Sequence, residues 1–193
     1  MSSASRLHLV LERISSLFRA ELRAAANDHD LKLVQLEALI FLAVANRYSD
    51  SAGAIAEYLG VTKGTASQTL LALERRGLIT KARDPVDGRV QHCHLTPEGA
   101  AIVASAHPVA ILTDAPERDV VEAEKAAVEL LRLMQRGRDH RTFGQCRTCS
   151  QFETHGTRYR CGLTGERLSR DDSLRICREH RSAEARAQLP LVT

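Results

Sequence analysis

Four cysteines in the last third of the chain most constrain what it can fold into. Cys146, Cys149, Cys161 and Cys177 form a C-x2-C-x11-C-x15-C pattern within a polar, arginine-rich segment. That segment has too few apolar residues to build a core of its own, so burial alone would leave it disordered. Four thiolates on one metal centre would order it, because a structural metal site supplies about 10–16 kcal/mol of apparent binding free energy. We therefore expect a small, irregular, metal-bound lobe over residues 137–193, called here the cysteine lobe.

Composition indicates a chain that can bury a core and does not cross a membrane. Its 193 residues suffice for one medium-sized domain with an appendage, and 44% of them are hydrophobic. No apolar run approaches the length of a membrane span, and the N-terminus lacks the apolar stretch of a signal peptide, so we expect a cytoplasmic protein. In that compartment the five cysteines are expected to be thiols or metal ligands rather than disulfides.

The first two thirds of the chain carry the spacing of amphipathic helices. Helices are predicted over residues 7–22, 34–45, 52–59, 62–76, 97–106 and 116–136. Their N-caps are Asp50 or Ser51, Thr62 and Thr96, and Gly60 and Gly77 end two of them. Two β-compatible runs, 78–83 and 89–95, flank an Asp-Gly pair and predict a hairpin. The fold class is therefore mainly α with a small β wing.

The order of these elements is that of a winged helix-turn-helix, whose second helix enters the DNA major groove. Ala56 is small where the two helix axes cross, and Gly60 supplies the turn between them. At the positive end of the second helix, Lys63 suits a phosphate, whereas Ser67 and Gln68 can reach base edges. The predicted DNA contacts are Thr62, Lys63, Gly64, Thr65, Ser67 and Gln68 on this helix, and Arg83 and Arg89 beside the hairpin tip.

Four stretches carry a resemblance to a known family. They are 55–68 (IAEYLGVTKGTASQ), 73–79 (LERRGLI), 83–89 (RDPVDGR) and 95–99 (LTPEG). In these stretches the chain resembles the MarR family of bacterial transcriptional regulators over roughly residues 5–136. The resemblance implies a homodimer formed by the first and last helices, which binds a pseudo-palindromic operator in double-stranded DNA, with a repressor as the expected type. Pro85-Val86 in the wing and Gln68 depart from the usual family residues.

The cysteine pattern alone leaves two kinds of metal centre open. Zinc and iron–sulfur clusters both bind deprotonated thiolates, and a C-x2-C pair on a tight turn directs two sulfurs to one centre. A zinc site could use Cys146, Cys149, Cys177 and His180, with Cys161 left out. An iron–sulfur cluster would use all four cysteines.

The spacing from Cys146 to Cys177, with Phe152 soon after the C-x2-C pair, resembles the cluster-binding stretch of high-potential iron–sulfur proteins. That resemblance covers about 35 residues and implies a [4Fe-4S] cluster, which we favour over zinc. The stretch lacks tryptophan, so a cluster here would be more exposed to oxygen or nitric oxide, which suits a sensor better than an electron carrier. We expect cluster loss to act on DNA binding through the last helix, which ends about ten residues before Cys146.

The remaining candidates point to no further chemistry. Cys93 on the second wing strand is expected to be a half-buried small hydrophobe, with His92 and His94 facing solvent. No paired carboxylates, Ser/His/Asp order or phosphate-binding loop occurs, so an enzyme is not expected. The hypothesis is a dimeric DNA-binding regulator of redox, oxygen, nitric oxide or iron status. Two alternatives remain: a regulator with a structural zinc site that responds to a small ligand, and an electron-transfer module on a vestigial DNA-binding domain.

Overall fold

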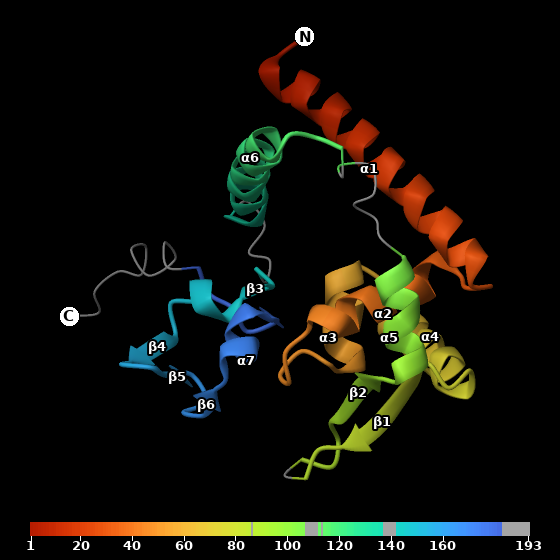
Figure 1. Cartoon of the computed structure of the whole chain (residues 1–193), viewed down its shortest axis with the longest axis vertical. Coiled ribbons are helices and arrows are strands. Elements are labelled where there is room, and N and C mark those ends of the chain that lie inside the picture. Colours follow the sequence, from red (N-terminus) through yellow and green to blue (C-terminus); the bar gives the residue numbers. More distant parts are fainter. Residues whose placement is uncertain (86, 107–111, 113, 137–141, 183–193) are drawn as a thin grey trace.

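A long helix, α1 (Ser3–Asp28), opens the chain and extends away from the rest of the molecule (Figure 1). Its N-terminus is capped by the Ser2 side chain, which accepts a hydrogen bond from the Ser5 backbone N–H. The computed structural model describes residues 1–85, 87–106, 112, 114–136 and 142–182. Only Ala26, near the end of α1, is buried in this helix. The apolar stripe predicted from the sequence is therefore mostly uncovered within one chain.

The predicted winged helix-turn-helix is present, with boundaries within a few residues of those expected from the sequence. Its elements are α2 (Leu33–Val44), α3 (Ala52–Leu59), α4 (Lys63–Arg75), β1 (Ile79–Arg83), β2 (Gln91–Leu95) and α5 (Pro97–Ser105). Side chains of Ser51, Thr62 and Thr96 cap α3, α4 and α5, each accepting from a backbone N–H three residues on. The helices pack around a core that includes Leu36, Leu39, Phe41, Ile55, Leu70 and Leu73.

The turn between α3 and α4 forms as the sequence indicates. Gly60 has a φ of 65°, a left-handed conformation that glycine adopts without the strain a side chain would add. Ala56 and Ala66 are both buried between the paired helices. Small residues at these positions let the two helices approach closely, which sets the position of α4 and of the surface that it presents.

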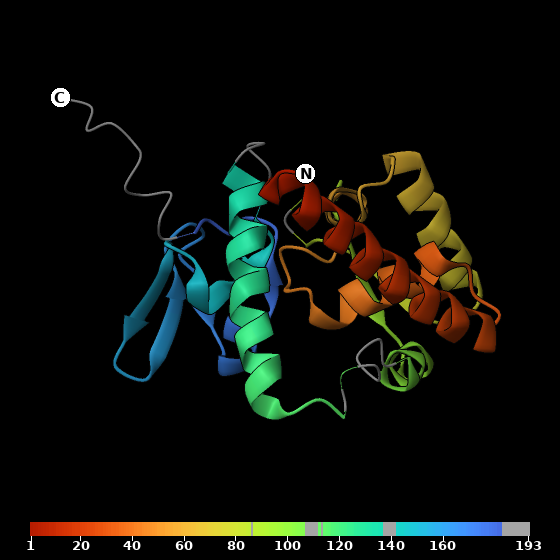
Figure 2. The ribbon, with the colours of Figure 1, turned by 90° about the horizontal axis from the view of Figure 1, so that it is seen from above.

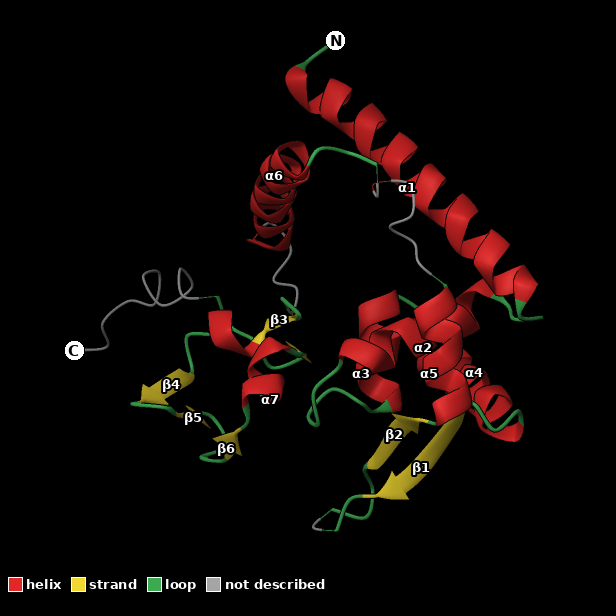
Figure 3. Cartoon of the chain, in the orientation of Figure 1, coloured by secondary structure: helices red, strands yellow, loops and turns green. Residues whose placement is uncertain are grey.

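The wing is a two-stranded antiparallel hairpin whose register runs from Ile79–Leu95 to Arg83–Gln91. Its loop is closed by hydrogen bonds from the Asp84 backbone N–H to the Val90 carbonyl and from the Asp87 N–H to the Asp84 carboxylate. The departure from the family noted at Pro85-Val86 falls partly outside the described residues, which omit Val86. Figure 3 shows the hairpin projecting from the helical body.

The last long helix, α6 (Glu117–Arg136), lies on the same side of the molecule as α1, away from the wing (Figures 1 and 2). Its large apolar side chains Val128, Leu131, Leu133 and Met134 are exposed. Leu7, Val10, Ile14 and Phe18 of α1 are exposed as well. Among the described helices, α6 included, none combines the length and apolar character that crossing a membrane requires.

The cysteine lobe has more regular structure than the irregular segment expected from its composition. It consists of β3 (Gly144–Gln145), η2 (Cys146–Thr148), β4 (Phe152–His155), β5 (Arg158–Cys161), β6 (Arg167–Leu168), α7 (Arg170–Leu174) and β7 (Ile176–Cys177). Strands β4, β5 and β6 form one antiparallel sheet, and β3 pairs with β7. Backbone hydrogen bonds, which composition does not reveal, supply this order. Residues 137–141 and 183–193 of the expected lobe lie outside the described structure.

The lobe also packs against the core of the winged helix. Phe143 makes edge-on contacts with Phe41 and Tyr58, with ring centroids 6.2 and 5.3 Å apart. Ile176 contacts the same core and forms a parallel β-bridge with Ala45. The lobe, which has too few apolar residues for a core of its own, therefore shares one with its neighbour.

Candidate functional site

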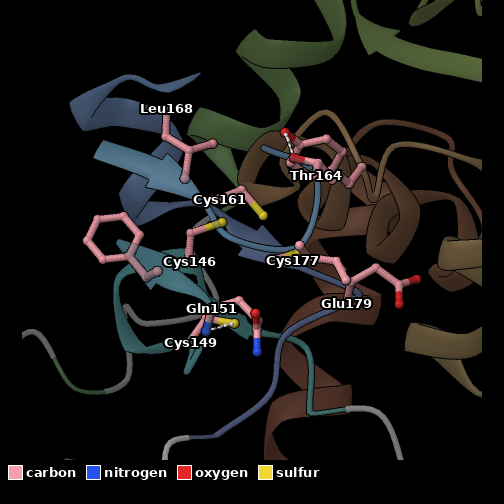
Figure 4. Close-up of a pocket in the computed structure, with 11 residues that line it drawn as sticks. Cys146, Cys149, Gln151, Cys161, Thr164, Leu168, Cys177 and Glu179 are labelled. Carbon is pink, nitrogen blue, oxygen red and sulfur yellow. Dashed lines mark hydrogen bonds between the residues drawn. The ribbon is translucent and has the colours of Figure 1, made fainter. Parts of the chain in front are cut away.

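The four predicted cysteine ligands come from three separate parts of the lobe and line one cavity. Cys146 opens η2 and Cys149 follows it, Cys161 ends β5, and Cys177 ends β7. The cavity has a volume of about 60 Å³, and Phe152, Leu163 and Leu168 supply much of its apolar lining. Figure 4 shows the cysteine side chains around it. Within the described residues, however, no three His, Cys, Asp or Glu side chains are arranged to hold a metal ion. The thiols surround a space without converging on a single point.

Two of these thiols affect each other's ionisation. Cys146 and Cys177 are hydrogen-bonded to each other and are both buried. The bond from Cys146 lowers the pKa of Cys177 to about 6, whereas the same bond and burial raise the pKa of Cys146. The contact therefore favours ionisation of one thiol of the pair over ionisation of both.

Two of the cysteine sulfurs accept hydrogen bonds from neighbouring groups. The Asn46 amide donates to Cys146 Sγ at 3.3 Å. Cys149 Sγ accepts from the backbone N–H groups of Gln151, at 3.5 Å, and of Arg181, at 3.4 Å. Donors of this kind stabilise negative charge on sulfur, and around metal-bound thiolates they tune the affinity and the reduction potential.

His180, considered from the sequence as a zinc ligand, lies away from the cavity. Its ring is buried, with Nδ1 2.5 Å from Thr142 Oγ1 and Nε2 2.9 Å from Thr148 Oγ1. Burial lowers its pKa, and the ring bridges two hydroxyls. Cys161 lines the cavity instead. The structure thus brings together the four-cysteine set and does not bring together the set containing His180.

The lobe is held on the connector between α2 and α3, residues 45–51, an arrangement that sequence reasoning missed. The Asn46 N–H donates to the Ile176 carbonyl, and the Arg178 N–H donates to Ser49 Oγ at 2.7 Å. The Arg178 guanidinium forms an ion pair with Glu57 of α3. The only sequence signal was a polar stretch between two helices, which reads equally well as a simple turn.

Two further connector residues bind the acidic side of the lobe. Arg47 forms ion pairs with Asp172, at 3.1 Å, and with Glu166, at 3.7 Å. The Tyr48 hydroxyl donates to Glu166 at 2.6 Å, and burial together with this bond raises the pKa of Tyr48 to about 12. Tyr48 also lines the cysteine cavity. The connector therefore leads into α3 and also supplies part of the wall of the candidate metal centre.

The predicted DNA contacts lie on an open surface. All six on α4 and its cap are exposed, as are Arg83 at the end of β1 and Arg89 in the wing loop. The Thr62 hydroxyl is engaged by the Thr65 N–H as the helix cap, so its main role is to hold the start of α4. Ala66, between these residues, is buried.

The base of the wing corrects the expectation that His92 faces solvent. Its ring bridges two carboxylates, with Nδ1 2.6 Å from Asp50 and Nε2 3.0 Å from Asp84. These bonds raise the pKa of His92. His94 is more exposed, 3.9 Å from Asp50. Cys93 is fully rather than half buried, and burial raises its pKa to about 11.

Comparison with known proteins agrees with this architecture. A sequence model of the MarR family matches residues 29–90. The transcriptional regulator HosA of Escherichia coli O157:H7 is 30% identical over 109 residues, which cover 55% of this chain and 81% of HosA. HosA of E. coli O111:H- is 33% identical over 82 residues, covering 42% of this chain and 61% of that protein. The chain thus spans less than two thirds of this second relative.

Solved structures show the same fold. The transcriptional regulator PA3341 superposes with a TM-score of 0.57 at 24% identity, over 67% of this chain and 98% of that one. The Staphylococcus aureus MepR–DNA complex superposes with a TM-score of 0.52 at 20% identity, over 68% and 97%. The stretch matched by the family model ends well before Cys146 and so concerns the winged helix alone. The chain belongs to the MarR family of winged-helix transcriptional regulators.

Proposed function

We propose that this protein is a homodimeric, DNA-binding regulator whose cysteine lobe holds an iron–sulfur cluster, with [4Fe-4S] as the favoured type, and thereby senses redox, oxygen, nitric oxide or iron status. One observation carries the proposal: four cysteines from three separate parts of the lobe line a single cavity whose wall includes Tyr48 of the connector. The site proposed for the cluster and the connector that leads into α3 are therefore in direct contact.

Family membership and an open contact surface support DNA as the partner. The related MepR fold has been solved with DNA. In this chain the exposed N-terminal end of α4, together with the exposed Arg83 and Arg89, offers hydrogen-bond donors for phosphate oxygens and base edges. Dimers are typical of the family, and the uncovered apolar faces of α1 and α6 supply the area that a dimer would bury. A symmetric dimer would bind a pseudo-palindrome with half-sites about one helical turn apart.

The set of donors around the cavity supports a cluster over the mixed zinc site. All four cysteines line the cavity, and His180 does not. A four-iron cluster uses all four thiolates, whereas the mixed zinc site would leave Cys161 out. When bound, the cluster would supply reversible one-electron chemistry and sensitivity to oxidants.

The contacts of the connector provide a route from the lobe to the DNA-binding surface. Asn46 contacts Cys146 and, through Oδ1, accepts from Ser49 Oγ at 2.7 Å. The next residue, Asp50, contacts the wing through His92 and through the Cys93 N–H. Rearrangement of the lobe would therefore reach both α3 and the wing. A second route runs through the end of α6, where Gln135 donates to the Thr142 carbonyl.

Purification of the full-length protein without air tests the proposal. We expect a brown protein with visible charge-transfer absorption and close to four iron and four sulfide per chain. Air exposure should bleach it and change its affinity for operator DNA. Cys161→Ser should lose the iron, whereas Cys93→Ser, which lies outside the lobe, should keep it. A colourless protein with one zinc per chain would reject the cluster.

A further inference from the structure

Three arginines of the cysteine lobe line one surface depression of about 340 Å³. Arg158 comes from β5, Arg167 from β6, and Arg170 is the first residue of α7. All three are exposed. Within the described parts of the chain, none of the three guanidinium groups forms a hydrogen bond or an ion pair. The other lining residues are Thr157, Tyr159, Leu168 and Ser169.

Three carboxylates of the lobe pair with arginines that lie outside this depression. Asp171 pairs with Arg175 at 2.7 Å. Asp172 and Glu166 pair with Arg47 of the connector. Docking of the lobe on the winged helix thus neutralises its acidic side and leaves the arginine depression facing outward. Like charges repel, and an anion bound among the three guanidinium groups would relieve that repulsion.

We propose that this depression binds backbone phosphates of duplex DNA outside the half-site contacted by α4. This inference rests on the proposed DNA-binding function. Guanidinium groups are well suited to phosphate oxygens because they donate paired, planar hydrogen bonds. The Thr157 hydroxyl offers one more donor at the rim.

The placement of the lobe favours DNA over another anionic partner. Figure 1 shows β5 and β6 towards the same end of the molecule as the wing, the end away from α1 and α6. The lobe and the wing are also attached to the same short connector, since Asn46 binds the Ile176 carbonyl and the Asp50 carbonyl binds the Cys93 N–H. A duplex that lies against α4 and the wing would therefore extend towards the depression.

The test compares two duplexes over a range of salt concentrations. One contains only the operator, selected from a random duplex pool with the anaerobically purified full-length protein and trimmed to its half-sites. The other carries about one extra helical turn on each side. The variant is R158Q/R167Q/R170Q. The control is R147Q/R181Q, which removes charge from exposed positions of the same lobe outside the depression.

For the wild type, the affinity should depend more steeply on salt concentration with the longer duplex than with the trimmed one. The slope of log affinity against log salt concentration should differ by up to about 0.9 for each phosphate neutralised. The triple variant should lose that extra slope and keep wild-type affinity for the trimmed duplex, while the control keeps both. Iron content and circular dichroism check that both variants fold.

Equal slopes on the two duplexes for the wild type would overturn the inference and leave the proposed function standing. Failure of the wild type to bind any selected duplex would instead reject the proposed function. Titration with inorganic pyrophosphate separates a free phosphate ligand from DNA. The assignment to DNA would be overturned if pyrophosphate bound saturably to the wild type but not to the triple variant, while the flanking DNA had no effect on the salt slope.

Discussion

The side-chain amide of Asn46 donates a hydrogen bond to Cys146 Sγ across 3.3 Å, between residues one hundred positions apart. Asn46 is buried, and its Oδ1 accepts from Ser49 Oγ and from the Tyr48 N–H at 3.1 Å. One side chain thus joins a proposed ligand to the turn that precedes α3. The sequence before and after Asn46 gives no sign of this role.

Asn46→Asp should weaken both the fold and the metal site. The new carboxylate has almost the same shape but cannot donate to sulfur, and its charge opposes that of a thiolate. We expect a loss of about 2 kcal/mol in the free energy of unfolding, from one buried polar group left without its partner. Iron per chain should fall as well. Urea unfolding and iron analysis measure the two effects. Asn27→Asp, on the exposed end of α1, is the matched control, and equal behaviour of the two variants would contradict the role assigned to Asn46.

Gly144→Ala should disrupt the lobe from within. A Cβ at this position would lie 2.6–2.7 Å from three atoms of the His180 ring, which is itself fixed by Thr142 and Thr148. Because the ring cannot move without losing those bonds, we expect about 1–3 kcal/mol of destabilisation and reduced iron retention. Gly88→Ala, in the wing loop with no atom near its Cβ position, is the control. Unchanged urea unfolding and iron content in Gly144→Ala would show that the His180 ring can move aside without measurable loss of stability.

Which features the sequence could predict depends on how local their causes are. The caps at Ser51, Thr62 and Thr96 act on N–H groups three residues away, and the turn at Gly60 depends on a single residue, so helix boundaries were predictable. The cysteine set was also visible as a spacing. The docking of the lobe was not, because it depends on single polar contacts such as those of Asn46 with Cys146 and Ile176.

His92 shows the same limit within the wing. The alternation of side chains along β2 puts His92 on the face opposite the buried Cys93, and this is confirmed. That alternation predicts that the His92 side chain faces solvent. Its ring instead bridges Asp50 and Asp84, which lie 42 and 8 residues away. A period of two specifies the face of a strand but carries no information about which charged groups another element brings to that face.

His92 should contribute a stabilisation that falls with rising pH. Hydrogen bonds to Asp84 and Asp50 raise the pKa of His92 above its ordinary value of 6.5 in the folded state. Protonated His92 therefore stabilises the fold fully below that ordinary value, and the contribution is lost as pH rises through the raised pKa.

His92→Gln should remove that contribution. The stability difference between wild type and variant should be larger at about pH 6 than at about pH 8.5, as measured by urea unfolding at both values. His94, the other titratable group facing Asp50, is more exposed and lies 3.9 Å from it, so His94→Gln should have a smaller effect. A difference for His92→Gln that is independent of pH would exclude a charged His92.

Cys93 should resist alkylation in the folded protein. Its side chain is buried, and burial raises its pKa to about 11. At pH 8 only about one thiol in a thousand would be ionised, and only the thiolate reacts readily. Treatment of the native protein with iodoacetamide, followed by peptide mass spectrometry, should leave Cys93 unmodified, and unfolding in urea should expose it. Rapid labelling of native Cys93 would instead indicate a reactive thiol at the wing.

Lys63→Ala should weaken binding to all DNA sequences to a similar degree. Lys63 is the first residue of α4 and is exposed at the end where the helix dipole is positive, so its ammonium group is placed for a phosphate rather than for a base edge. Each lost phosphate contact should reduce the log–log salt slope by about 0.9, while the preference between operator and unrelated duplex stays the same. Fluorescence anisotropy over a range of salt concentrations measures both. Lys125→Ala, on the exposed surface of α6, is the control because that helix lies away from the wing. If Lys63→Ala keeps the wild-type salt slope, Lys63 does not contact a phosphate. If the preference between operator and unrelated duplex changes, Lys63 contacts a base edge.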